Sequence, residues 1–184
     1  MKILAISGSP RKKNVYGMIK TVCEAAGGDF EILNIADQSI HHCNDCRNCH
    51  KTYKCAINDD MQDIHKKIAD ADCIVLGSPT YFDNVSGPMK NFMDRCLPFY
   101  FSRGLEGKKA ILLTSGNFED QLEFDENGKC KWHKEEKESV ERCLRSMEYF
   151  CKIMGISIVG KIYALHDDWE IKESELICMG KRLL

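Results

Sequence analysis

The chain has 184 residues, of which 43% are hydrophobic and 29% charged, and its formal net charge is −2. A chain of this length buries a core without disulfides, and its near-neutral charge offers no basic surface for nucleic acid or an anionic membrane. The longest apolar runs are too short to span a bilayer and the N-terminus begins a strand rather than a secretion signal, so we expect a cytoplasmic protein without nucleic-acid or membrane partners.

Short apolar runs alternate with amphipathic stretches along the chain, which predicts strands alternating with helices. In chain order, the expected strands are 2–7, 30–35, 73–79, 108–116 and 156–164. The expected helices are 15–26, one within 58–72, about 87–97, about 136–154 and a short closing helix within 172–184. We expect Asp59 or Asp60 to cap the second helix.

This alternation predicts an α/β fold of parallel strands joined by crossover helices. Five strands in a chain of this length suit a flavodoxin-like three-layer sandwich with a five-stranded parallel sheet of order 2-1-3-4-5. We expect a single domain over residues 1–184, with a cysteine-rich loop inserted at about 41–57.

Ligands of such sheets bind beyond the carboxyl ends of the strands, which predicts ligand loops at 7–16, 78–87 and 115–120. The first loop, SGSPRKKN, sets a tight turn, two hydroxyls, a guanidinium and an amide before a helix N-terminus, a combination that suits a phosphate. It lacks the dinucleotide fingerprint and the Walker lysine loop, so a mononucleotide phosphate is favoured over a dinucleotide. A polar turn that binds nothing is the alternative.

The second loop, GSPTYFDNVSGP, combines flat apolar surface with polar edges. Tyr81 and Phe82 supply the apolar surface, and Asn84 supplies a polar edge. A planar heterocycle with many acceptors, such as a flavin ring, needs this mixture, although the aromatic residues taken alone could belong to the core.

Eleven cysteines are many for a reducing compartment, where a disulfide framework is not expected. Five fall in apolar patterns and are expected to be buried: Cys23, Cys73, Cys96, Cys143 and Cys151. Four others have the spacing C-x2-C-x2-C-x5-C: Cys43, Cys46, Cys49 and Cys55.

The two short gaps let three of these thiols curl around one side and the longer gap lets the fourth return, so all four can serve one [4Fe–4S] cluster. A small zinc loop, a redox-active thiol pair and a metal-free loop are the alternatives. The flanking His41, His42 and His50 are expected to be solvated rather than ligands.

Two of these motifs carry a family resemblance. GSPR after the first strand and SPTYFDNVSGPMKNFMDR after the third resemble the NADPH-dependent FMN reductase branch of the flavodoxin-like fold, and the cysteine run narrows the resemblance to the iron–sulfur flavoproteins. By motif, the resemblance covers about residues 1–116. It implies that Ser9, Arg11 and Asn14 hold the FMN phosphate, in the first loop, which also contains Ser7. It also implies that the isoalloxazine ring is lined by Pro79, Thr80, Tyr81, Phe82, Asn84, Ser115 and Gly116.

Relatives often have Ser or Thr directly after the asparagine of the phosphate loop, where this chain has Val15. That hydroxyl is therefore either missing or supplied by Tyr16. Trp132 and His133, in the polar stretch after the fourth strand, either cover the flavin face or are a packed Trp and an incidental neighbour.

The resemblance implies an electron-relaying flavoprotein, with FMN and a [4Fe–4S] cluster as cofactors and no side chain acting as nucleophile or general base. It also implies a homodimer or homotetramer in which the cluster of one chain could face the flavin of another. The electron donor would be ferredoxin, or NAD(P)H as a co-substrate. A cluster-free NAD(P)H-dependent FMN or quinone reductase and a non-catalytic flavin- or metal-binding sensor are the alternatives.

Overall fold

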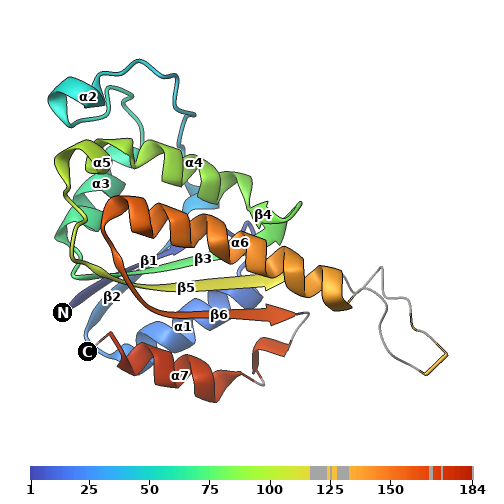
Figure 1. The fold of residues 1–184 in the computed structure, drawn as a ribbon. Helices are drawn as coiled ribbons and strands as arrows, with labels where there is room; N and C mark the ends of the chain where they lie inside the picture. Colours follow the sequence, from blue (N-terminus) through green and yellow to red (C-terminus); the bar gives the residue numbers. More distant parts are fainter. Residues whose placement is uncertain (117–123, 125, 128–132, 166–167, 171, 184) are drawn as a thin grey trace.

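The computed structural model describes every residue except 117–123, 125, 128–132, 166–167, 171 and 184. Its parallel strands lie in the order β2-β1-β3-β5-β6 (Figure 1). Their bounds are β1 (Lys2–Ser7), β2 (Asp29–Asn34), β3 (Cys73–Tyr81), β5 (Lys109–Gly116) and β6 (Ser157–Leu165). This is the predicted order, to which β4 (Asn84–Val85) adds a two-residue strand paired antiparallel with the end of β3.

Helices cover both faces of the sheet (Figure 1). One face is covered by α1 (Asn14–Ala26) and α7 (Glu173–Lys181). The other carries α3 (Met61–Asp70), α4 (Gly87–Arg95), α5 (Leu97–Ser102) and α6 (His133–Met154). The shorter elements are η1 (Ile35–Asp37), α2 (Cys49–Thr52) and η3 (Asp168–Glu170). The strands are apolar along most of their length because helices bury them from both sides.

All five cysteines expected in the core are buried: Cys23, Cys73, Cys96, Cys143 and Cys151. Burial raises the pKa of Cys23 and of Cys151 to about 12, so these thiols stay protonated and unreactive. Among the described helices, none is both long and apolar enough to cross a membrane.

The parallel strands bring their carboxyl ends to one edge of the sheet. Ser7 lies beside Gly77, and Pro79 lies beside Ser115, so the ends of β1, β3 and β5 meet there. The cysteine loop lies elsewhere, over α5 and the C-terminal end of α4 (Figure 1). Because α4 has nine residues, the two regions are separated along it by about 13 Å.

Candidate functional site

The loop after β1 is tied to the start of α4 by buried hydrogen bonds. The Gly8 N–H donates to the Gly77 carbonyl at 2.8 Å, and Ser86 Oγ donates to the Gly8 carbonyl at 2.6 Å. Ser86 is also the N-cap of α4, where its Oγ accepts from the Met89 N–H at 3.3 Å. A Cβ at Gly8 would lie 2.7 Å from the Cβ of Met89, so this close approach requires glycine.

The N-terminus of α1 is open to an anion. Lys13, at the N-cap, makes no side-chain cap bond, and the first turn of α1 contains no acidic residue. The positive end of the helix dipole at this terminus suits a phosphate. Arg11 is exposed beside this end, and Ser9 shapes the turn before it by donating from Oγ to the Arg11 carbonyl at 2.8 Å.

The remaining residues predicted for the phosphate are less accessible than Arg11. Ser7 and Ser9 are buried, and Asn14 and Tyr16 are half-buried at the start of α1. The structure thus brings all five to one place, with the guanidinium the most accessible of their polar groups.

The turn between β3 and β4 presents aromatic side chains to solvent. Tyr81 is 42% exposed and Phe82 is fully exposed. Phe82 and Asp83 have left-handed backbone, with φ of 47° and 62°, which costs about 1–2 kcal/mol for each non-glycine residue. Side chains of α6 hold this turn: Arg142 pairs with Asp83, and Ser146 Oγ lies 2.8 Å from Oδ1 of Asn84.

The ends of β3 and β5 carry hydroxyl groups that contact one another. The Thr80 and Thr114 hydroxyls lie 3.1 Å apart, and Thr114 donates to the Ser78 carbonyl at 2.8 Å. Ser115 and Gly116 are buried beyond them, and Pro79 is half-buried. The predicted flavin residues therefore lie at the edge of the sheet where the carboxyl ends of β3 and β5 meet. Trp132 and the side chain of His133 lie outside the described residues.

The four thiols of the cysteine loop line one hollow that is partly open to solvent. Cys43 and Cys46 are exposed, and Cys49 and Cys55 are half-buried. Burial, together with the three neighbouring thiols, raises the pKa of Cys49. In the part of the chain that the structure describes, no three His, Cys, Asp or Glu side chains are grouped so as to hold a metal ion.

The backbone of the cysteine loop is unusual. Left-handed φ values occur at Asp45 (52°), Arg47 (57°) and Tyr53 (57°). Of the six described non-glycine residues with positive φ, five lie in this loop or in the β3–β4 turn. Such strain tends to gather at ligand-binding sites, so its distribution agrees with both candidate loops. The imidazole of His50 packs 4.4 Å from the Phe101 ring, which places the loop against α5.

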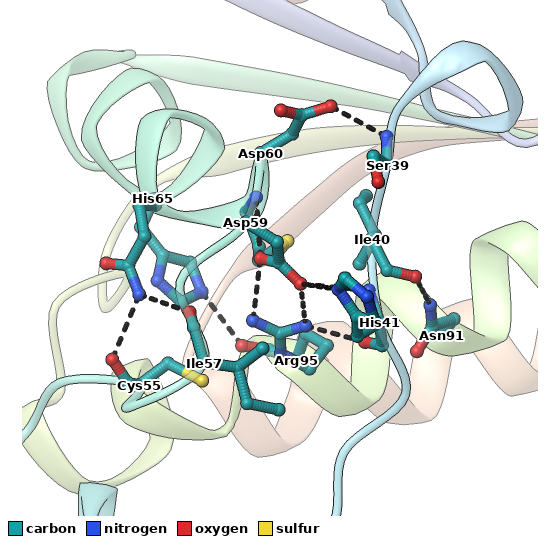
Figure 2. A network of polar contacts seen from close by, with 12 residues as sticks. Ser39, Ile40, His41, Cys55, Ile57, Asp59, Asp60, His65, Asn91 and Arg95 are labelled. Atoms are coloured by element: carbon teal, nitrogen blue, oxygen red, sulfur yellow. Dashed lines mark hydrogen bonds and ion pairs between the residues drawn. The ribbon is translucent and has the colours of Figure 1, made fainter.

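A buried ion pair lies between the two ends of the cysteine loop (Figure 2). Arg95 Nη1 lies 2.6 Å from Asp59 Oδ2, and Nη2 lies 2.9 Å from Oδ1, with the side chains 0% and 2% exposed. Burial alone would raise the pKa of Asp59, but hydrogen bonds from Arg95 and from the His41 and Met61 N–H groups lower it to about 2.

Sequence reasoning missed this pair. It predicted a capping role for Asp59 or Asp60; Asp59 does accept from the Met61 N–H at 3.1 Å, and Asp60 makes no side-chain cap bond. The available signal is helical spacing, because Met89, Phe92 and Arg95 form the buried face of α4.

Residues 1–126 match the family model of the NADPH-dependent FMN reductases. An iron–sulfur flavoprotein of Archaeoglobus fulgidus is 41% identical over 98 residues, which cover 52% of this chain and 48% of that protein. An iron–sulfur flavoprotein of Methanocaldococcus jannaschii is 38% identical over 120 residues, which cover 63% of this chain and 62% of that protein. The chain thus spans less than two thirds of the length of either relative.

Among solved structures, a flavodoxin from the domain Archaea aligns with a TM-score of 0.61 and 16% identity, over 100% of this chain and 96% of that one. At this identity the likeness concerns the fold alone. It confirms the predicted flavodoxin-like arrangement.

Proposed function

The chain belongs to the NADPH-dependent FMN reductase family, and we propose that it is an FMN-binding oxidoreductase whose cysteine loop holds a [4Fe–4S] cluster. The family match and the iron–sulfur flavoprotein relatives confirm the resemblance expected from the motifs. Bound FMN would exchange one or two electrons, and a cluster would pass single electrons.

For FMN, the proposal rests on the edge where β1, β3 and β5 end. The open N-terminus of α1 and the exposed Arg11 suit the phosphate. The exposed Tyr81 and Phe82 suit one face of the ring, while the buried ends of β3 and β5 exclude water from the other side. The contacts of α6 with Asp83 and Asn84 orient this turn.

For the cluster, the observation that carries the proposal is the convergence of Cys43, Cys46, Cys49 and Cys55 on one hollow. A cubane takes four cysteine thiolates, and four thiols line this hollow, together with the carboxylates of Asp45 and Asp94 and the imidazole of His50. Arg95 is among the residues that line the same hollow, and its buried positive charge would lie beside an anionic group bound there.

The cluster is tested by iron and sulfide analysis of protein purified without oxygen. We expect about four iron and four sulfide per chain for the wild type. Cys55→Ser should lose most of both, whereas Cys178→Ser should lose neither, because Cys178 is an exposed thiol of α7. Equal iron in the two variants would overturn the proposed ligand set.

FMN binding is tested by titrating flavin-free protein with FMN and following quenching of flavin fluorescence. We expect one FMN per chain and weaker binding by Arg11→Met, because a guanidinium to phosphate contact is lost. Arg103→Met is the matched control, since Arg103 is an exposed arginine paired with Glu106 outside both loops. If the two variants bind FMN equally, Arg11 does not hold the phosphate.

A second candidate is an NAD(P)H-dependent FMN or quinone reductase without a cluster. It is favoured by the position of the loops after β1 and β3, which lie at the opposite end of α4 from the cysteine loop. Their hydrogen bonds, Ser86 to Gly8 and Ser146 to Asn84, do not involve the cysteine loop. Rapid bleaching of the flavin by NADPH in protein that contains no iron would select this candidate.

The donor and the assembly are part of the proposal. We expect ferredoxin or NAD(P)H to reduce the protein, and a homodimer or homotetramer in solution. A flavin that stays oxidised with both donors would favour a sensor instead, and light scattering reports the assembly directly.

A further inference from the structure

The two ends of the cysteine loop meet at one buried side chain. Arg95 Nη1 donates to the His41 carbonyl at 2.6 Å, at the start of the loop. The same guanidinium pairs with Asp59, just after the loop, and Arg95 lines the same hollow as Cys55. Asp59 in turn accepts from the His41 N–H at 2.9 Å. Figure 2 shows that Arg95 and Asp59 lie between the two strands of loop backbone.

Neighbouring contacts also hold the loop ends. At the first end, Asp60 accepts from the Ser39 N–H at 2.7 Å, and Asn91 Nδ2 donates to the Ile40 carbonyl at 2.9 Å. At the second end, Gln62 Nε2 donates to the Cys55 carbonyl at 3.0 Å. Asn91 and Gln62 each fix one end to a helix, whereas the Ser39–Asp60 contact and the Arg95–Asp59 pair each join both ends.

At least one donor of the guanidinium has no acceptor among the described residues. Arg95 Nε–H is buried and has no acceptor among the residues that the structure describes. Arg95 also lines the hollow that the four thiols line. A sulfur-rich anionic group in that hollow would find a fixed positive charge and hydrogen-bond donors beside the Cys55 sulfur.

Charge at this place has a direct electrochemical consequence. Reduction adds one negative charge to an iron–sulfur group, so a nearby cation favours the reduced form and a nearby anion opposes it. Net charge and hydrogen bonds to sulfur are among the factors that set the potentials of such groups. Arg95 and Asp59 should therefore act in opposite directions on the potential, although they form one ion pair.

We propose that Arg95 is the positioning residue of the cysteine loop: paired with Asp59, it holds both loop ends and sets the reduction potential of the group bound by the four thiols. This inference rests on the proposed function for its electrochemical part. The other part, the holding of both loop ends by Arg95, concerns the loop alone and applies with or without a bound cluster.

The test compares Arg95→Gln and Asp59→Asn, with Arg103→Gln as the control. Redox titration of the reconstituted protein, followed by visible absorbance, should give a lower potential for Arg95→Gln and a higher one for Asp59→Asn. Arg103→Gln, which removes an exposed guanidinium paired with Glu106, should match the wild type. Because both loop variants break the same contact, a purely structural role would not move the potential in opposite directions.

Hydrogen exchange of the iron-free protein tests the loop ends independently. The amide of His41 should exchange about tenfold faster in both loop variants, the effect of losing a charged hydrogen bond, and at the wild-type rate in Arg103→Gln. Arg95→Lys keeps the positive charge but loses the two-pronged contact of the guanidinium with Asp59. In this variant the His41 amide should exchange fast, while the reduction potential should stay near that of the wild type.

The outcomes separate the two proposals. Reduction potentials that shift in the same direction in both loop variants, or not at all, overturn the electrochemical role of Arg95. An unchanged exchange rate of the His41 amide overturns its role in holding the loop ends. If Arg95→Gln does not fold, Asp59→Asn decides by the sign of its potential shift. If the wild type binds no iron, the cluster proposal fails, and exchange at His41 alone then decides the role of Arg95.

Discussion

Replacing Arg95 by methionine is expected to destabilise the fold strongly. The guanidinium is fully buried and contacts Asp59 at 2.6 and 2.9 Å. In Arg95→Met the Asp59 carboxylate would stay buried, with the N–H groups of His41 and Met61 still donating to it and His41 Nδ1 3.4 Å away. Breaking a buried ion pair from one side costs about 3–5 kcal/mol, and because two donors remain we expect about 3 kcal/mol.

The assay is urea unfolding of iron-free protein at pH 7, for the wild type, Arg95→Met, Asp59→Asn and the double variant. The double variant should lose at least about 1 kcal/mol less than the sum of the single losses, because the second substitution removes the charge that the first leaves unpaired. Arg103→Met removes an equal charge from an exposed pair and should leave the free energy of unfolding unchanged within error. Additive single losses, or an Arg95→Met loss no larger than that of Arg103→Met, would refute the reasoning.

Three further predictions concern other contacts. Ser86→Ala should lower the free energy of unfolding by about 1–2 kcal/mol and weaken FMN binding, because it removes both the α4 N-cap and the hydrogen bond to Gly8. Arg142→Ala should weaken FMN binding several-fold without changing the melting temperature, because it frees Asp83 in the exposed β3–β4 turn. Finally, the pKa of Asp59 is about 2 in the fold against 3.8 ordinarily, so its contribution to stability is complete above about pH 4 and is lost as the pH falls through 2. The stability difference between the wild type and Asp59→Asn should therefore shrink by about 2 kcal/mol over that range.

Each of these has a contradicting result. A Ser86→Ala variant with wild-type FMN affinity would show that the Gly8 contact does not shape the phosphate loop. Loss of melting temperature in Arg142→Ala would assign that arginine to the fold rather than to the turn. A wild-type advantage over Asp59→Asn that stays constant down to pH 2 would show that Asp59 is not an ionised partner of Arg95.

The sheet was predictable because each buried parallel strand is a nearly continuous apolar run bounded by turn residues. The missed elements are those that depend on contacts distant in sequence or on unusual backbone. The β4 strand has two residues and forms only because Phe82 and Asp83 adopt left-handed φ. Residues 97–102 form α5 as a separate helix after Arg95, where periodicity alone predicted one helix to about residue 97.

The candidate site was predictable where chemistry is local. The four thiols and the phosphate loop are recognisable from spacing and composition, and in the structure the four thiols line one hollow. Arg95 was not recognisable in this way, because an arginine at the end of a helix ordinarily lies in solvent near the negative end of the dipole. Its burial depends on Asp59, which is 36 residues away in sequence.

The absorption spectrum of protein purified under argon, with FMN, iron and sulfide measured on the same sample, tests the proposed cofactors most directly. We predict flavin bands with a broad visible shoulder, and about one FMN, four iron and four sulfide per chain. Flavin bands without the shoulder, with iron near zero, would contradict the cluster, and a spectrum without flavin bands would contradict the FMN site itself.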